Sequence, residues 1–173
     1  YLLPKIHKNK TPPPGRPIIS ANGSPTEKIS QFVDHFLNQT TFDLASYVRD
    51  TTHFLQIIKD IRDLPEDTLL VTLDVESLYT NIPTTMGLIA ARKALEKHRP
   101  LADAKPSNQS LVKLLELVLT RNNFQFNGQH FLQIKGTAMG TKAAMGYANT
   151  ALGYFEEQHV YTYPDQPYLY KRF

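Results

Sequence analysis

Residues 69–83 read LLVTLDVESLYTNIP, and the interpretation of the whole chain starts from this stretch. Apolar and β-branched residues lead directly into an acid, Asp74, which is the pattern of a buried β-strand that ends in a carboxylate. Such a carboxylate is costly beside an apolar strand unless a cation, a hydrogen-bond donor or water compensates it. Asp74 therefore caps the following turn, pairs with an arginine, or serves a site. The break at residues 80–83 favours a strand that opens into a tight turn over a site.

Three sequence motifs resemble those of the reverse transcriptase of Penelope-like retroelements, a family related to telomerase reverse transcriptase. They are LDVESLYTNIP at residues 73–83, GTAMGT at residues 136–141 and YAN at residues 147–149. The similarity begins with LLPKIHK at residues 2–8 and continues to the last residue.

The resemblance implies an α+β fold: right-hand polymerase fingers and a partial palm, with helices packed on a small, mainly antiparallel sheet. Residues 1–67 would be mainly fingers. Residues 68–173 would be palm with inserted fingers helices, truncated before the second acidic motif. Residues 168–173 would begin the strand that leads to that motif.

The same resemblance implies an RNA-directed DNA polymerase that acts in the nucleus on an RNA template, a DNA primer and deoxynucleoside triphosphates. Its phosphoryl transfer uses two Mg²⁺ (or Mn²⁺) ions, each of which needs carboxylate oxygens. Asp74 is the implied catalytic residue and metal ligand, and the carbonyl of Val75 adds a neutral ligand. One aspartate cannot hold both ions, so we expect the chain to be inactive by itself.

The nucleotide would be held by side chains and backbone from two places. Lys5 and Arg16 take the family's positions against the triphosphate, where a guanidinium fork and an ammonium suit phosphate oxygens. Backbone N–H groups around Ser77 and Leu78 would meet the same phosphates. The ring of Tyr79 would lie under the sugar and exclude a 2′-hydroxyl; alternatively, it fills the core.

The glycine-rich loop at residues 136–141 would support the template and the nucleotide base, with Gly136, Met139 and Gly140 in contact. Glycines let a backbone approach a flat ligand closely, although the same spacing also serves close helix packing. Met145 departs from the family pattern, which usually has a proline there.

Composition agrees with a nucleic-acid partner. The net charge is +3, and the first 16 residues contain four basic residues and no acid, so the remainder has 15 basic and 16 acidic residues. This basic arm suits phosphates, with Lys8 as a weaker candidate, or is a solvated surface tail. The chain has no cysteine, which excludes disulfides, and no apolar run long enough to span a membrane.

Apolar residues at helical spacing predict several helices. They begin near Ser24, at Asp50 or Thr51, at Thr84 or Thr85, and at Ser107, and a helix of small residues covers about 143–160. Asp34 and His35 lie off the apolar stripe of the first helix and are expected in solvent. Residues 100–108 should form a polar loop.

The sequence Asn127-Gly128 between alternating apolar runs predicts a β-hairpin over residues 124–134. Three phenylalanines and a leucine of this hairpin form either an aromatic platform for nucleic acid or part of the core, and core packing is favoured. They are Phe124, Phe126, Phe131 and Leu132.

Two further functions remain open. The chain could be a non-catalytic nucleic-acid-binding remnant of the same fold. A magnesium-dependent phosphohydrolase would need several more acids around Asp74, and Glu76 is the only neighbouring acid.

Overall fold

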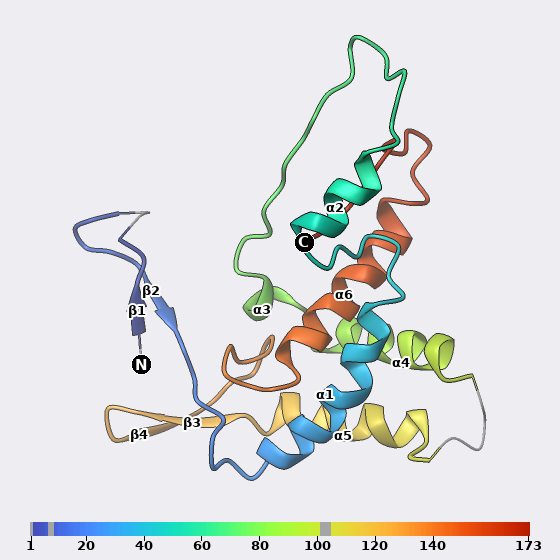
Figure 1. Cartoon of the computed structure of the whole chain (residues 1–173). Helices are drawn as coiled ribbons and strands as arrows, with labels where there is room; N and C mark the ends of the chain where they lie inside the picture. The colour runs from blue at the N-terminus through green and yellow to red at the C-terminus, as the bar shows by residue number, and fades with distance from the viewer. Residues whose placement is uncertain (1, 7–8, 101–104) are drawn as a thin grey trace.

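The computed structural model is α+β, as expected, and contains six helices and two small antiparallel sheets in the part of the chain that it describes (Figure 1). The described residues are 2–6, 9–100 and 105–173. Lys8 and residues 101–104 of the expected loop at residues 100–108 therefore lie outside the described residues. The helices are α1 (Glu27–Thr41), α2 (Thr51–Ile58), α3 (Leu78–Asn81), α4 (Thr84–His98), α5 (Asn108–Thr120) and α6 (Ala144–His159). The strands are β1 (Leu2–Pro4), β2 (Gly15–Pro17), β3 (Asn123–Phe126) and β4 (Gln129–Leu132).

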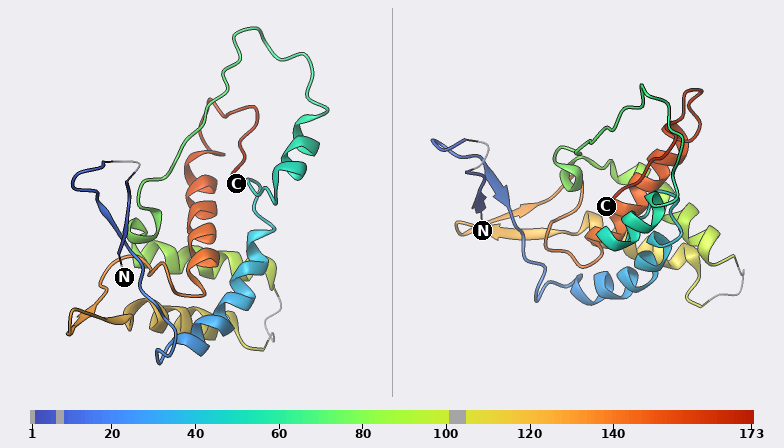
Figure 2. Two further views of the ribbon diagram at one scale, coloured as in Figure 1. Left: turned by 60° about the vertical axis from the view of Figure 1, so that its left-hand side comes forward. Right: turned by 45° about the horizontal axis from the view of Figure 1, so that its top comes forward.

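The hydrophobic core lies among α1, α4, α5 and α6, in which α1 and α4 pack on each other and on both α5 and α6 (Figures 1 and 2). Each of these helices contributes apolar side chains that are almost completely buried. The largest are Val33, Leu37, Leu95, Leu111, Leu115 and Tyr147. Burial of one such side chain stabilises the fold by about 1.5–3 kcal/mol, so this bundle holds the molecule together.

Capping chemistry fixes two of the predicted helix starts. The Asp50 carboxylate accepts from the backbone N–H of His53 at 2.8 Å and starts α2, and the Ser107 hydroxyl accepts from the N–H of Ser110 at 3.1 Å and starts α5. Both predictions are confirmed. In contrast to the other long helices, α2 has no buried residue, so its apolar stripe does not join the core.

The first predicted helix begins later than expected. α1 starts at Glu27 with Thr26 at the cap position, and Ser24 makes no side-chain cap. The Glu27 carboxylate instead accepts from the N–H of Gly23 at 2.8 Å. This bond resembles one half of a capping box, but its donor is the residue before Ser24, so it stabilises the turn that precedes the helix.

Two hairpins form, β1–β2 and β3–β4, and the second is the one predicted from Asn127-Gly128. In the second, Asn127 and Gly128 have φ angles of 49° and 75°, which is the left-handed backbone that a tight hairpin turn requires. In the first, Leu3 pairs with Arg16, and the Lys5 N–H extends the ladder to the Pro14 carbonyl at 2.8 Å. The two hairpins project from the same side of the helical body (Figures 1 and 2).

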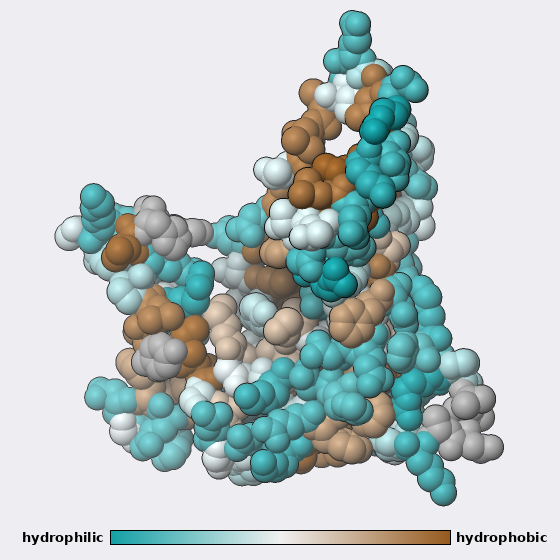
Figure 3. All heavy atoms as spheres, viewed as in Figure 1, coloured by the Kyte–Doolittle hydropathy of each residue, from teal (hydrophilic) through white to brown (hydrophobic). Residues whose placement is uncertain are grey.

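The expected buried strand at residues 69–75 is wrong. The backbone there is extended but makes no backbone hydrogen bond to any described residue, and its apolar side chains are exposed, up to 94% for Leu70. This segment belongs to the long loop that rises above the bundle, where brown side chains are visible (Figure 3). The physical reason is the lack of a neighbouring strand, because an unpaired strand has no sheet to bury its faces.

The expected packing of helices on a small sheet is corrected for the same reason. Among the described elements, each sheet has only two strands, and the helices pack on one another. The last predicted strand, at residues 168–173, is reduced to a single parallel bridge between Tyr47 and Arg172. No helix of the described residues is long and apolar enough to cross a membrane.

Candidate functional site

The glycine loop lies directly on α3, the turn that follows Asp74. The Thr137 N–H donates to the Tyr79 carbonyl at 2.7 Å. A side chain at Gly136 would collide with that carbonyl and with the backbone of Thr80, and the Gly136 φ of 71° also favours glycine. The structure therefore brings together two segments that the sequence separates by more than 50 residues.

The other end of the loop lies against the base of the N-terminal hairpin. A side chain at Gly140 would collide with the Ile19 carbonyl, and its Cβ would lie 3.2 Å from the Cα of Ser20. Beyond the loop, the Ala143 N–H donates to the buried Ser30 hydroxyl at 2.9 Å, which ties the start of α6 to α1. One loop thus joins the hairpin base, α3 and the bundle.

The predicted sugar-contacting residue is half-buried. Tyr79 lies in α3 and packs against the edge of the helical core, so the alternative that its ring fills the core is realised in part. Leu78 packs there as well, whereas Ser77 is exposed and has a left-handed φ of 52°. The Ser77 carbonyl accepts the Thr80 N–H at 3.1 Å and closes this short turn.

The predicted metal ligands are exposed. Asp74 forms no hydrogen bond or ion pair with any residue that the structure describes, so it neither caps the following turn nor pairs with an arginine there. Val75 is 50% exposed and, like Asp74, belongs to the unpaired extended segment. The two residues precede α3 in the chain, and Asp74 forms no ion pair with Lys5 or Arg16.

The basic side chains of the arm face solvent to different degrees. Arg16 on β2 is exposed, and Lys5, just after β1, is half-buried. Neither forms an ion pair with a described acid. Both are therefore available to a phosphate, and the segment that follows their hairpin lies against Gly140 through Ile19 and Ser20.

The described residues do not make a two-ion centre. No three His, Cys, Asp or Glu side chains of the described part lie close enough together to hold a metal ion. Two adjacent magnesium ions need several carboxylate oxygens, and Asp74 supplies one carboxylate. We therefore derive no catalytic step through metal ions from these residues alone.

Sequence reasoning missed a buried polar cluster at the end of α6. The Glu156 carboxylate is almost fully buried and accepts from the Arg172 guanidinium at 2.7 Å and from the Ser46 hydroxyl at 2.5 Å. Arg172 also donates to Asn149 at 2.7 Å. The cluster fastens the end of the chain to α6, and no local pattern could have predicted it, because its members are far apart in sequence.

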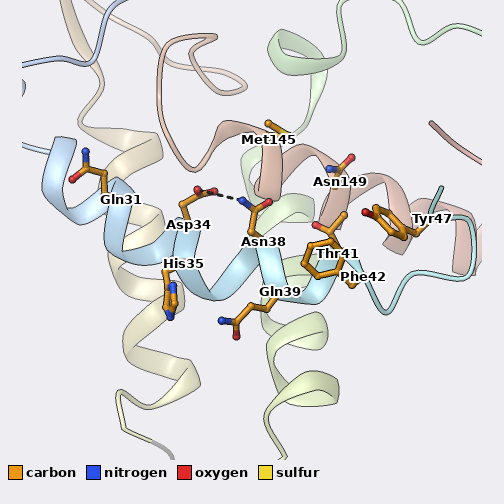
Figure 4. Close-up of a pocket in the computed structure, with 10 residues that line it drawn as sticks. All are labelled: Gln31, Asp34, His35, Asn38, Gln39, Thr41, Phe42, Tyr47, Met145 and Asn149. Carbon is orange, nitrogen blue, oxygen red and sulfur yellow. Dashed lines mark hydrogen bonds between the residues drawn. The ribbon is translucent and has the colours of Figure 1, made fainter. Parts of the chain in front are cut away.

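A polar pocket between α1 and α6 was also missed (Figure 4). It has a volume of about 640 Å³, and Asp34, Asn38, Met145 and Asn149 line it. Asp34 was expected in solvent, but burial raises its pKa, and one of its carboxylate oxygens has no hydrogen-bond partner in the described part of the chain. His35 is exposed, as predicted.

Comparison with known proteins adds no family or relative. No family model matches the chain, and neither a curated protein nor a solved structure matches it.

Proposed function

We propose that the chain is the fingers and first palm portion of an RNA-directed DNA polymerase that copies RNA with deoxynucleoside triphosphates. The observation that carries the proposal is the glycine loop, whose two ends lie on α3 and on the base of the basic hairpin. The sequence motifs had assigned these three segments to one nucleotide and template site. In the structure the glycine loop, α3 and the base of the basic hairpin also lie on the same side of the helical bundle.

In this proposal Asp74 is the metal-binding acid, and further carboxylates come from protein beyond the described residues. The extended segment of residues 69–75 has backbone amides and carbonyls that are open to pairing with another strand. Pairing would bury its apolar side chains and lower the dielectric around Asp74, which strengthens its attraction for a cation.

The test is primer extension by a version of the chain that continues past Phe173, with an RNA template, a DNA primer and magnesium. We expect extension, and we expect Asp74→Asn to abolish it. Asp67→Asn is the matched control, because Asp67 is an exposed acid of the same long loop. Unchanged extension by the Asp74 variant would refute the assigned role of Asp74.

Sugar selection tests Tyr79 separately. If the ring excludes a 2′-hydroxyl, Tyr79→Ala should incorporate ribonucleotides, whereas Tyr79→Phe should retain the preference for deoxynucleotides. A thermal melt of each variant is needed because the ring also packs on the core. Unaltered sugar selection in a folded Tyr79→Ala variant would remove this role.

A non-catalytic nucleic-acid-binding remnant is the second candidate. The observation that favours it is that, among the described residues, Asp74 belongs to no group of three His, Cys, Asp or Glu side chains that could hold a metal ion. Both candidates bind template and primer, but only the polymerase extends the primer, so the same assay separates them.

A further inference from the structure

The β3–β4 hairpin gathers three phenylalanine rings on one face. Phe124 pairs directly with Phe131, and Phe126 pairs with Gln129. Directly opposed residues share a face of an antiparallel pair, as do residues two apart on one strand. The Phe124 and Phe131 rings are stacked, with centroids 5.4 Å apart and planes inclined by 20°.

This aromatic face is not part of the core. Phe126 is 52% exposed and Phe131 is 41% exposed, and the two strands pack on no other described helix or strand. The expectation that these rings fill the core is therefore wrong. The Asn122 side chain donates to Gln133 at 2.9 Å and closes the base of the hairpin.

The sequence on either side of this hairpin is basic and contains no acid over a long stretch. Between Glu116 and Glu156 the sequence has three basic residues, Arg121, Lys135 and Lys142, and no Asp or Glu. Residues 1–26, which include the other hairpin on the same side of the molecule, also contain no acid (Figure 1). A polyanion is attracted to such a surface.

We infer that the aromatic face of β3–β4 binds single-stranded nucleic acid by stacking its bases on Phe126 and Phe131. Unpaired bases expose flat apolar surfaces next to phosphates, so they match exposed rings within a basic surround. A base-paired duplex hides those surfaces. β4 ends four residues before Gly136, so the hairpin leads directly into the glycine loop. A nucleic-acid strand bound to the hairpin would therefore be close to that loop.

The stacking of bases on the phenylalanine rings does not depend on the proposed function. Only the identification of the bound nucleic acid as the template rests on that function. The experiment is fluorescence anisotropy of a labelled 15-nucleotide oligouridylate with the 173-residue chain. Phe126→Ala and Phe131→Ala should each weaken binding by about 5- to 100-fold, the usual loss for one stacked base.

Leu132→Ala is the matched control. Leu132 is 48% exposed in the same hairpin but pairs with Asn123 on the opposite face, so its removal should leave binding unchanged. Phe126→Trp should retain or improve binding. Circular dichroism and thermal melts establish that each variant is folded.

Three results would overturn the inference. They are unchanged affinity in both phenylalanine variants, an equal loss in Leu132→Ala, or self-association of the chain that disappears in Phe126→Ala, which would make the face a contact between copies. Binding should persist in Asp74→Asn. If oligouridylate binds through the rings but no primer is extended by the longer chain, the proposed polymerase fails and the stacking surface stands.

Discussion

The helical bundle and the extended segment of residues 69–75 are both rich in apolar residues, but the fold treats them in opposite ways. In the bundle, Leu37 has no exposed surface, whereas Leu70 in the extended segment is 94% exposed. The bundle helices complete their own hydrogen bonds and need only a neighbour for one apolar face. A strand needs a partner for its backbone as well, so apolar sequence alone does not bury it.

The largest expected effect tests this contrast directly. Leu37→Ala should lower the free energy of unfolding by about 2–5 kcal/mol, because it opens a cavity in a packed core. Leu70→Ala should change it by less than about 0.5 kcal/mol. Chemical denaturation of both variants measures the difference. A large loss in Leu70→Ala would mean that the segment is buried in solution.

The buried ion pair gives the next effect. Arg172→Ala should destabilise the fold by about 3 kcal/mol, because it leaves the Glu156 carboxylate buried without its cation. Lys171→Ala is the control, since Lys171 reaches only the Ala45 carbonyl at an exposed position. Similar losses in the two variants would contradict a specific contribution from the pair.

A smaller effect is expected where α4 meets α6. A side chain at Gly87 would occupy the position of the Tyr147 hydroxyl and ring, so Gly87→Ala should cost about 1–3 kcal/mol through overpacking. Thr85→Ala, at an exposed position of the same helix, should be nearly neutral. Equal thermal stability of these two variants would show that the helices separate easily there.

The smallest effect concerns Tyr147 itself. Its buried hydroxyl has no hydrogen-bond partner among the described residues, so Tyr147→Phe should raise stability at neutral pH by about 1 kcal/mol. Burial raises the pKa of Tyr147 to about 12 from its usual 10. The unfolded chain therefore loses this proton first, and stability should fall from pH 10 to 12 in the wild type. Comparison of melts should show a shallower fall in Tyr147→Phe.

Local patterns predicted most of the elements. Capping residues identified the starts of α2 and α5, helical spacing identified α4, and small residues identified α6. Neither Thr84 nor Thr85 caps α4, because Pro83 occupies the cap position without a side-chain cap. Asn127-Gly128 identified the second hairpin, and each of these signals depends on residues close in sequence. The predicted strand at residues 69–75 did not form, because a strand needs a partner strand from a distant part of the sequence. The prediction that Phe126 is buried failed for a similar reason. The alternation of apolar and polar residues predicts which side chains share a face of a hairpin, but not which part of the protein covers that face.

The candidate site divides in the same manner. The motifs assign Tyr79 and the glycine loop to one site, which stays a prediction, and the Thr137 hydrogen bond places these two segments side by side. They could not predict the clash that only glycine avoids at residue 140, or the partner of Glu156. Those depend on tertiary approach, and neither has a sequence signature.

Glu156 also makes the docking of separate segments an all-or-none event. Its carboxylate accepts hydrogen bonds from Ser46, in the loop after α1, and from Arg172, near the last residue. The backbone of Arg172 also forms hydrogen bonds with the backbone of residues 46 and 48. If one segment detached, the other would be left against a buried anion with incomplete compensation. The two should therefore leave and return together, and protection of their amides from hydrogen exchange should rise and fall as a unit.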